Sequence, residues 1–188
     1  LISPKNEIKI IDFGVSIKTD KENKNPRIGT INYNAPELIL GYTKYGKEID
    51  IWSLGCTFYE MMTKEKLIIY KHSEYEIINE ILTIFGFPDK NDYPQFYSFP
   101  NNDLFPNFYK KSKININAFF YKKLPLEFLQ FKDLLINMLQ LNPKNRISLD
   151  DALNDPSLSD IQKTDNLPFI SLPELNTFDN IKKNKKKS

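Results

Sequence analysis

The 188-residue chain is poor in the side chains that build disulfides and metal cages. It has one cysteine and one histidine, so neither an internal disulfide nor a cysteine-rich zinc site can form within it. Proteins without disulfides are typical of reducing compartments. We therefore expect an intracellular location, cytoplasmic or nuclear.

Long apolar runs and an excess of one charge are missing as well. No apolar run reaches the ~18 residues of a membrane-spanning helix, and the start of the chain lacks the pattern of a secretory signal. The net charge is +2, with 26 Lys and Arg against 24 Asp and Glu, whereas nucleic-acid-binding surfaces need a clustered basic face. We expect neither nucleic acid nor a membrane as a partner.

What remains is the composition of an ordinary globular protein, with 40% hydrophobic and 27% charged residues. A chain of this length is expected to form one domain or most of one. It begins with Leu1 rather than Met, and we expect it to be a piece of a longer protein.

The spacing of apolar residues predicts a mainly α-helical fold. Residues 1–14 alternate like a short β-hairpin. Residues 15–36 show no pattern, and because a loop longer than ~12–15 residues is usually functional or disordered, this is the first place to look for function. Residues 47–62 are apolar on nearly all sides, which predicts a helix buried at the centre of the domain.

Further helices are predicted at 73–85, which opens with a capping box, at 126–141 and at 148–155. Residues 86–125, rich in aromatic residues, proline and asparagine, indicate a long surface excursion held down by its rings. The tail, 157–188, ends in a run of lysines that repel one another. We expect that tail to be partly disordered.

Asp12, Phe13 and Gly14 end the predicted hairpin with a carboxylate, a ring and a flexible residue. A carboxylate at the end of a buried strand is a hard oxygen ligand of the kind that Mg²⁺ prefers, and glycine lets the backbone swing. By itself, the tripeptide is explained as well by a turn at a strand end. Asp12 is thus a candidate metal ligand.

Three further motifs follow in order: residues 29–37 (GTINYNAPE), 50–55 (DIWSLG) and 141–148 (LNPKNRIS). With residues 12–14, they resemble successive motifs of the protein kinase C-lobe. The resemblance covers residues 1–156. It implies an incomplete C-lobe with a short β-hairpin, an activation segment, a buried central helix and further helices.

The subgroup follows from two longer stretches. Residues 37–62 and 73–89 are similar to those of cyclin-dependent and MAP kinases, and residues 86–125 correspond to the insert of that CMGC group. The resemblance places the chain nearest the cyclin-dependent branch. It implies a Ser/Thr kinase that uses ATP and Mg²⁺ to phosphorylate a protein substrate, with a cyclin-like activator as a candidate partner.

The resemblance also implies roles for single residues. Asp12 would hold Mg²⁺ between the β- and γ-phosphates, and Phe13 would pack to set the active or inactive state. Thr30 would hydrogen-bond the catalytic base, which indicates serine or threonine as the acceptor. Glu37 and Arg146 would form a buried ion pair that ties the activation segment to the lower helices.

Other motif positions belong to the acceptor loop and its anchors. Asp50, at the start of the buried helix, would accept hydrogen bonds from the catalytic-loop backbone. The remaining positions are Gly29, Tyr33, Asn34, Ala35, Pro36, Trp52 and Gly55.

Three positions depart from the family pattern. Asn34 replaces the arginine that orders the loop for a proline after the target residue, and Asn25 stands where the activating threonine is usual. Asn142 replaces an aspartate at a turn that suits either residue. We therefore predict a weak preference for Ser/Thr-Pro and no activating phosphorylation at the usual place.

The motifs of the first half of a kinase domain are missing. None of the six glycines forms a Gly-x-Gly, and His72 is followed by Ser73 rather than by Arg-Asp. The phosphate loop, strand lysine and catalytic base are therefore absent from this sequence. We expect the chain to begin just after the catalytic loop and to be inactive alone; the alternative is a non-catalytic scaffold or binding remnant of a kinase.

Overall fold

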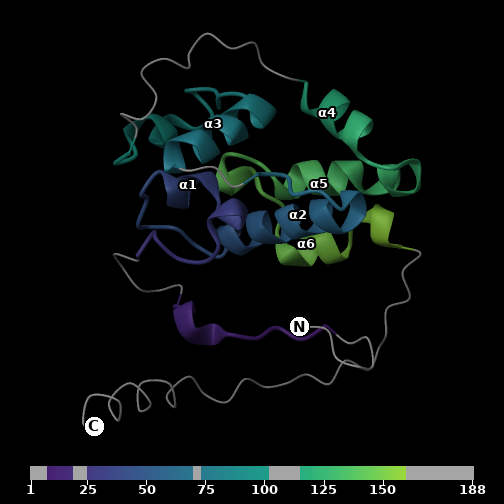
Figure 1. Ribbon diagram of the computed structural model, residues 1–188, viewed down its shortest axis with the longest axis horizontal. Coiled ribbons are helices and arrows are strands. Elements are labelled where there is room, and N and C mark those ends of the chain that lie inside the picture. Colours follow the sequence, from purple (N-terminus) through teal and green to yellow (C-terminus); the bar gives the residue numbers. More distant parts are fainter. Residues whose placement is uncertain (1–7, 19–24, 70–72, 102–114, 160–188) are drawn as a thin grey trace.

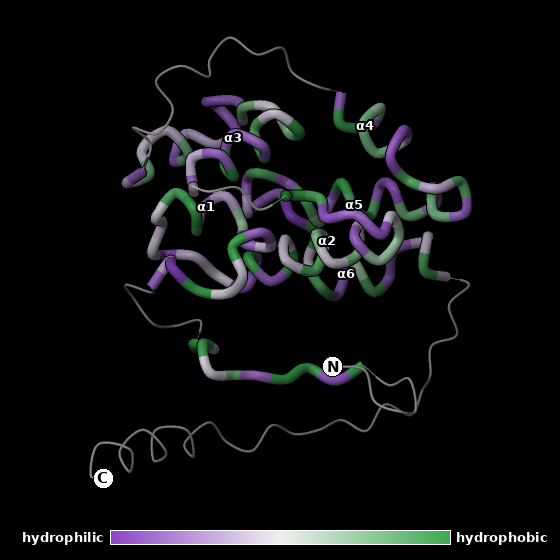
Figure 2. Tube along the Cα trace, in the orientation of Figure 1, coloured by the Kyte–Doolittle hydropathy of each residue, from purple (hydrophilic) through white to green (hydrophobic). Residues whose placement is uncertain are grey.

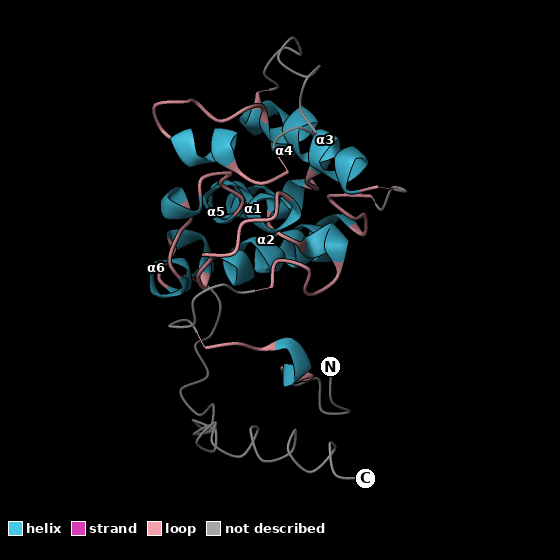
Figure 3. Ribbon diagram, turned by 90° about the vertical axis from the view of Figure 1, so that its left-hand side faces the viewer, coloured by secondary structure: helices cyan, strands magenta, loops and turns pink. Residues whose placement is uncertain are grey.

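The computed structural model describes residues 8–18, 25–69, 73–101 and 115–159 (Figure 1). Within these ranges the chain is mainly helical, as predicted, and Figure 3 shows its helices joined by loops. Strand-type pairing in the same ranges is confined to a single bridge residue, Ile8. No helix in the described part is long and apolar enough to cross a membrane.

The α-helices of the described ranges run from four to 16 residues. The α-helices are α1 (Pro36–Ile39), α2 (Glu48–Thr63), α3 (Glu74–Phe85), α4 (Ile116–Lys123), α5 (Lys132–Met138) and α6 (Leu149–Leu153). The 3-10 turns are η1 (Phe13–Val15), η2 (Ile31–Tyr33), η3 (Pro94–Ser98), η5 (Leu126–Phe131), η6 (Pro143–Asn145) and η7 (Pro156–Leu158).

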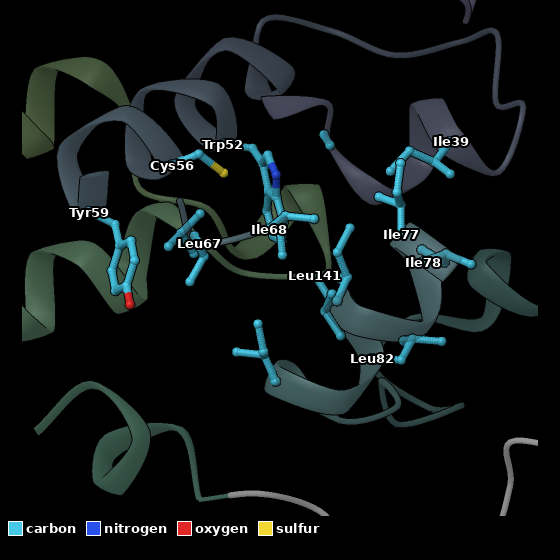
Figure 4. Close-up of a cluster of buried hydrophobic side chains, with 14 of the residues drawn as sticks. Ile39, Trp52, Cys56, Tyr59, Leu67, Ile68, Ile77, Ile78, Leu82 and Leu141 are labelled. Atoms are coloured by element: carbon cyan, nitrogen blue, oxygen red, sulfur yellow. The ribbon is translucent and has the colours of Figure 1, made fainter. Parts of the chain in front are cut away.

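Helix α2 lies at the centre of the helical body and packs against α5, while α3 packs against α1 and α4 (Figure 1). Trp52, Cys56 and Tyr59 of α2 are at most 2% exposed, and Figure 4 shows them within the buried hydrophobic cluster. Burial raises the pKa of the Cys56 thiol to about 12. Cys56 is therefore a core residue and not a nucleophile.

The central helix is buried on most of its circumference, as predicted, but one stripe of α2 faces outward. Leu54 and Met61 are 45% and 57% exposed, and Asp50 and Thr57 are exposed on the same stripe. Spacings of four, three and four residues bring these side chains onto one helix face. No described element covers that face.

The predicted helix over 126–141 is also different in the structure, where η5 precedes the shorter α5. The Phe128 N–H donates to the Pro125 carbonyl, a 3-10 bond of 2.9 Å. Phe128 and Phe131 are three residues apart, and in a 3-10 turn such side chains fall on the same side. Their rings lie 6.5 Å apart and Phe131 contacts Phe58 of α2. A three-residue spacing therefore fits a 3-10 turn as well as an α-helix.

The two predicted helix starts at serine are present. The Ser73 hydroxyl accepts the Glu76 N–H at 3.3 Å, and the Ser148 hydroxyl accepts the Asp151 N–H at 3.1 Å. Each bond satisfies an N–H that the first helical turn leaves without a partner. Helix α3 ends at Gly86, whose φ of 77° lies in the region that favours glycine.

The aromatic-rich stretch of residues 86–125 is held to the core by ring contacts where the structure describes it. Phe96 is fully buried and lies 5.8 Å from Tyr93 and 6.1 Å from Phe99 between ring centroids. Phe120 of α4 is also fully buried and lies 6.0 Å from the ring of Tyr59. Residues 102–114 of this stretch lie outside the described residues.

Residues 8–18 lie apart from the helical body in two perpendicular views (Figures 1 and 3). Figure 2 shows hydrophobic residues along this segment, and Ile10 is 83% exposed. The buried strand expected before Asp12 is therefore not formed in the described residues. A hairpin of two strands is marginal without further packing, and the first expected strand, in residues 1–7, lies outside the described part.

The predicted ion pair between Glu37 and Arg146 is present at the centre of the body. The Arg146 Nη1 donates to Glu37 Oε1 at 2.6 Å, and Nη2 donates to Oε2 at 2.7 Å. The two side chains are 1% and 0% exposed. This two-pronged geometry is the strongest that a guanidinium and a carboxylate can adopt.

The other donors of Arg146 bind backbone carbonyls of three further residues. Nε donates to Gln140 at 2.8 Å, Nη1 to Glu48 at 3.0 Å and Nη2 to Leu141 at 3.4 Å. The guanidinium also lies over the Trp52 ring, with its carbon 5.2 Å from the ring centroid. All the N–H groups of the guanidinium are therefore used.

Replacing Arg146 by Met should lower the free energy of unfolding by about 3–5 kcal/mol, because the Glu37 carboxylate is left buried without its partner. Urea denaturation measures the change. The matched control is Lys123→Met, which breaks the exposed 3.3 Å pair with Glu65 and should cost less than about 1 kcal/mol. Equal losses in the two variants would contradict the prediction.

Replacing Gly55 by Ala should destabilise the protein although alanine favours helices. An added Cβ would lie 2.9 Å from Cγ and Cδ2 of Leu139 on the neighbouring segment, and overpacking costs about 1–3 kcal/mol against a helix gain of about 1 kcal/mol. We expect a net loss of about 1 kcal/mol in urea denaturation and a larger loss for Gly55→Val. Thr57→Ala, on the exposed stripe, is the control; a more stable Gly55→Ala would refute the argument.

Candidate functional site

The acceptor loop, defined here as the segment from Asn25 to Asn34, is closed by its own side chains. The Asn25 Oδ1 accepts the Arg27 N–H at 2.9 Å, and the Asn34 Nδ2 donates to the Ile28 carbonyl at 2.8 Å. Gly29 has a φ of 68°, a conformation that glycine adopts without strain. Two of the three asparagines that depart from the family pattern, Asn25 and Asn34, therefore shape this loop.

The end of the acceptor loop is seated on α2. The Ser53 hydroxyl donates to the Tyr33 carbonyl at 2.8 Å, and the Tyr33 hydroxyl donates to the Glu60 carboxylate at 2.5 Å. The Asn32 side chain, 6% exposed, donates to the Ile68 carbonyl at 3.0 Å. The loop thus lies against the central helix and the segment that follows it.

The contact between Tyr33 and Glu60 favours the protonated phenol. The hydrogen bond to the carboxylate raises the pKa of Tyr33 to about 12, and desolvation and the charge of Glu60 act in the same direction. A tyrosine is protonated at neutral pH even at its ordinary pKa, and the shift keeps Tyr33 a donor at more alkaline pH as well.

Thr30 is at the surface, whereas the residues that follow the acceptor loop are buried. Thr30 is exposed, and its hydroxyl makes no cap hydrogen bond to η2, which it precedes. Ala35 is fully buried, and Pro36 occupies the first turn of α1 beside the ion-paired Glu37. The loop therefore presents a hydroxyl at the surface while its end is fixed in the core.

Asp50 and Trp52 lie in the first turns of α2. Asp50 is exposed, yet the protein around its carboxylate raises its pKa through desolvation. The Trp52 ring is fully buried, and its Nε1 has no hydrogen-bond partner in the described part of the chain. The expected contact of Asp50 with a catalytic loop stays a prediction.

Asp12, Phe13 and Gly14 lie apart from the acceptor loop. Asp12 is exposed with a φ of 61°, and its Oδ1 accepts the Gly14 N–H at 3.3 Å. Phe13 is 42% exposed and does not pack in the core. The structure therefore does not bring the predicted metal ligand together with the acceptor loop.

The donor chemistry of Asp12 suits Mg²⁺, which proteins usually bind through one or two carboxylates together with substrate phosphates. Among the residues that the structure describes, no group of three or more His, Cys, Asp or Glu side chains could hold a metal ion. That Asp12 would be one ligand of a Mg²⁺ site shared with phosphates stays a prediction.

Sequence reasoning missed three residues that hold the acceptor loop. Tyr45 donates its hydroxyl to the Asn25 carbonyl at 2.7 Å, and Ser53 and Glu60 bind Tyr33. Ser53 falls within a recognised motif, which was a signal for it. Nothing in the residue types marks Tyr45 or Glu60, because a tyrosine that binds a backbone carbonyl has no pattern along the chain.

Known proteins match the chain over most of its length. The family model of the protein kinase domain matches residues 1–158. The serine/threonine-protein kinase ppk23 of Schizosaccharomyces pombe is 35% identical over 158 residues, which are 83% of this chain and 38% of that protein. Cyclin-dependent kinase 7 of Dictyostelium discoideum is 32% identical over 175 residues, 92% of this chain and 46% of that protein. The chain thus spans less than half the length of these relatives.

Two solved structures have the same fold. A chain of the yeast RNA Pol II CTD kinase CTDK-1 complex matches 78% of this chain over 48% of its own length, with 30% identity and a TM-score of 0.68. The CAK complex from Chaetomium thermophilum bound to ATP-γ-S matches 84% of this chain and 48% of that chain, with 26% identity and a TM-score of 0.72. The motifs, the fold and these matches together lead to one conclusion: the chain belongs to the protein kinase family, in its cyclin-dependent-kinase-like (CMGC) branch.

Proposed function

We propose that the chain is part of a protein serine/threonine kinase that transfers the γ-phosphoryl group of ATP to a protein hydroxyl. The observation that carries this proposal is the acceptor loop seated on α2, with its end fixed by the buried pair of Glu37 and Arg146 and Thr30 exposed upstream of it. Phosphoryl transfer depends on positioning and charge stabilisation. A loop attached by these contacts supports the positioning part.

Four residues of this chain would have separate roles in the reaction. Asp12 would hold Mg²⁺, which neutralises the charge that develops on the β- and γ-phosphates. The exposed Thr30 hydroxyl would bind the catalytic base and favour serine or threonine as the acceptor. Tyr33, bonded to Glu60, and Asn34, bonded to the Ile28 carbonyl, would keep the loop in shape beneath the substrate.

The groups that this sequence lacks must come from elsewhere in a complete kinase. The sequence has no Gly-x-Gly and no His-Arg-Asp, so we propose that the complete protein supplies the phosphate loop, the strand lysine and the catalytic base. We further propose a cyclin-like activator, because several relatives carry the name cyclin-dependent kinase. The intracellular location stays a prediction.

A non-catalytic scaffold is the second candidate. It is favoured by the exposure of Asp12 and its separation from the acceptor loop. Transcript sequence upstream of Leu1 separates the two candidates. A His-Arg-Asp motif and a Gly-rich loop would support the enzyme, and their absence would support the scaffold.

In the complete kinase, Asp12→Asn should lower kcat by at least about 100-fold, because an amide oxygen cannot replace the charge that holds Mg²⁺. The 188-residue chain alone should transfer no labelled phosphate. The matched control is Asp89→Asn, an exposed aspartate in the segment after α3, which should leave kcat unchanged. Turnover by the isolated chain above its own Asp12→Ala variant would disprove the assignment of roles.

The complete kinase should discriminate weakly between Ser-Pro and Ser-Ala peptides, by less than about 10-fold in kcat/KM. Asn34 is short and uncharged, and its amide is engaged with the Ile28 carbonyl, so it lacks the planar fork of donors of an arginine. Asn34→Arg should sharpen the preference for proline. A preference of about 100-fold with Asn34 in place, some 2.7 kcal/mol at 1.36 kcal/mol per decade, would mean that another residue reads the proline.

A further inference from the structure

The acceptor loop is tied to the rest of the molecule at its beginning by a residue outside it. Tyr45, in the turn between α1 and α2, donates its hydroxyl to the backbone carbonyl of Asn25 at 2.7 Å. The side chain of Asn25 in turn accepts the Arg27 N–H. Both the backbone and the side chain of Asn25 are therefore held.

Tyr45 is suited to act as a fixed donor. It is only 5% exposed, so its ring cannot move without opening the body. A tyrosine hydroxyl is protonated at neutral pH at its ordinary pKa, and burial raises the pKa of the Tyr45 hydroxyl further. Asn25 is exposed, so the hydrogen bond joins a donor in the core to an acceptor on the surface loop.

A second tie closes the other end of the acceptor loop. The Asn34 Nδ2 binds the Ile28 carbonyl at 2.8 Å, and a Cβ added at Gly29 would lie 3.1 Å from the Asn34 Oδ1. The Asn34 side-chain amide thus binds Ile28 and packs closely against Gly29. The left-handed φ of Gly29 allows the chain to turn there.

Neither tie uses a charged group. Kinase activation loops are commonly ordered by a phosphate that pairs with arginines. Each of the two ties is a hydrogen bond between an uncharged side chain and a backbone carbonyl.

We propose that Tyr45 and Asn34 are positioning residues that hold the acceptor loop in its substrate-binding shape without a phosphate on the loop. This inference rests on the proposed kinase function. It assigns to Tyr45 a role that residue type alone does not reveal. It also predicts that the complete kinase binds its acceptor in the unphosphorylated state.

Limited trypsin digestion tests the hydrogen bonds from Tyr45 and Asn34 without any activity measurement. The complete protein is first treated with a phosphatase, so that the loop carries no phosphate. Cleavage after the exposed Arg27, followed by mass spectrometry, should be slow in the wild type. Tyr45→Phe should speed it about 10-fold, which is the effect of one lost hydrogen bond. Tyr42→Phe is the matched control: Tyr42 contacts Phe99 through its ring. Equal cleavage rates in Tyr45→Phe and Tyr42→Phe would overturn the proposal.

Steady-state kinetics of the same proteins test the positioning role. Tyr45→Phe and Asn34→Asp should each raise KM for a protein acceptor about 10-fold and leave KM for ATP unchanged, and phosphatase treatment should leave the wild-type kcat/KM intact. An unchanged acceptor KM in both variants, or loss of most activity after phosphatase treatment, would overturn the proposal. If no form of the complete protein has kinase activity, the proposed function fails, while the trypsin comparison still decides whether Tyr45 holds the loop.

Discussion

The buried pair of Glu37 and Arg146 is the constraint on which the rest of the molecule depends. Removing two charges from water costs several kcal/mol per ion, and the cost is offset only when every donor finds an acceptor. The acceptors come from α1, from the first turn of α2 and from the segment after α5. A different arrangement of these elements would leave a charge buried and unpaired. The pair therefore selects one packing of elements that are far apart in the sequence.

Helix α2 joins this core to the acceptor loop. Its inward side carries Trp52 and Tyr59 in the hydrophobic cluster, while Ser53 and Glu60 bind the loop at Tyr33. Ser53 and Glu60 are seven residues apart, which is two helical turns and brings both onto one face. Any displacement of α2 would therefore disturb the core and the loop together, and the geometry of the loop is only as stable as the packing of the helix.

The sequence predicted the central helix, the serine caps and the buried ion pair, because each leaves a signal in residue type, spacing or motif. It did not predict the outward stripe at Leu54 and Met61, because hydrophobicity does not say which element covers a face. It could not separate a 3-10 turn from an α-helix at Phe131, since a spacing of three suits both. The tie from Tyr45 to Asn25 had no signal at all, because its acceptor is a backbone carbonyl that every residue possesses.

Because the single cysteine of the chain is buried, its reactivity reports local opening of the hydrophobic core. Cys56 is 2% exposed and its thiol has a pKa of about 12, so at neutral pH almost none of it is thiolate and reagents cannot reach it. Alkylation then proceeds through molecules in which α2 has separated from its neighbours, and its rate follows that opening equilibrium. Because the chain has no other cysteine, the rate of thiol labelling measures how often the centre of this domain opens.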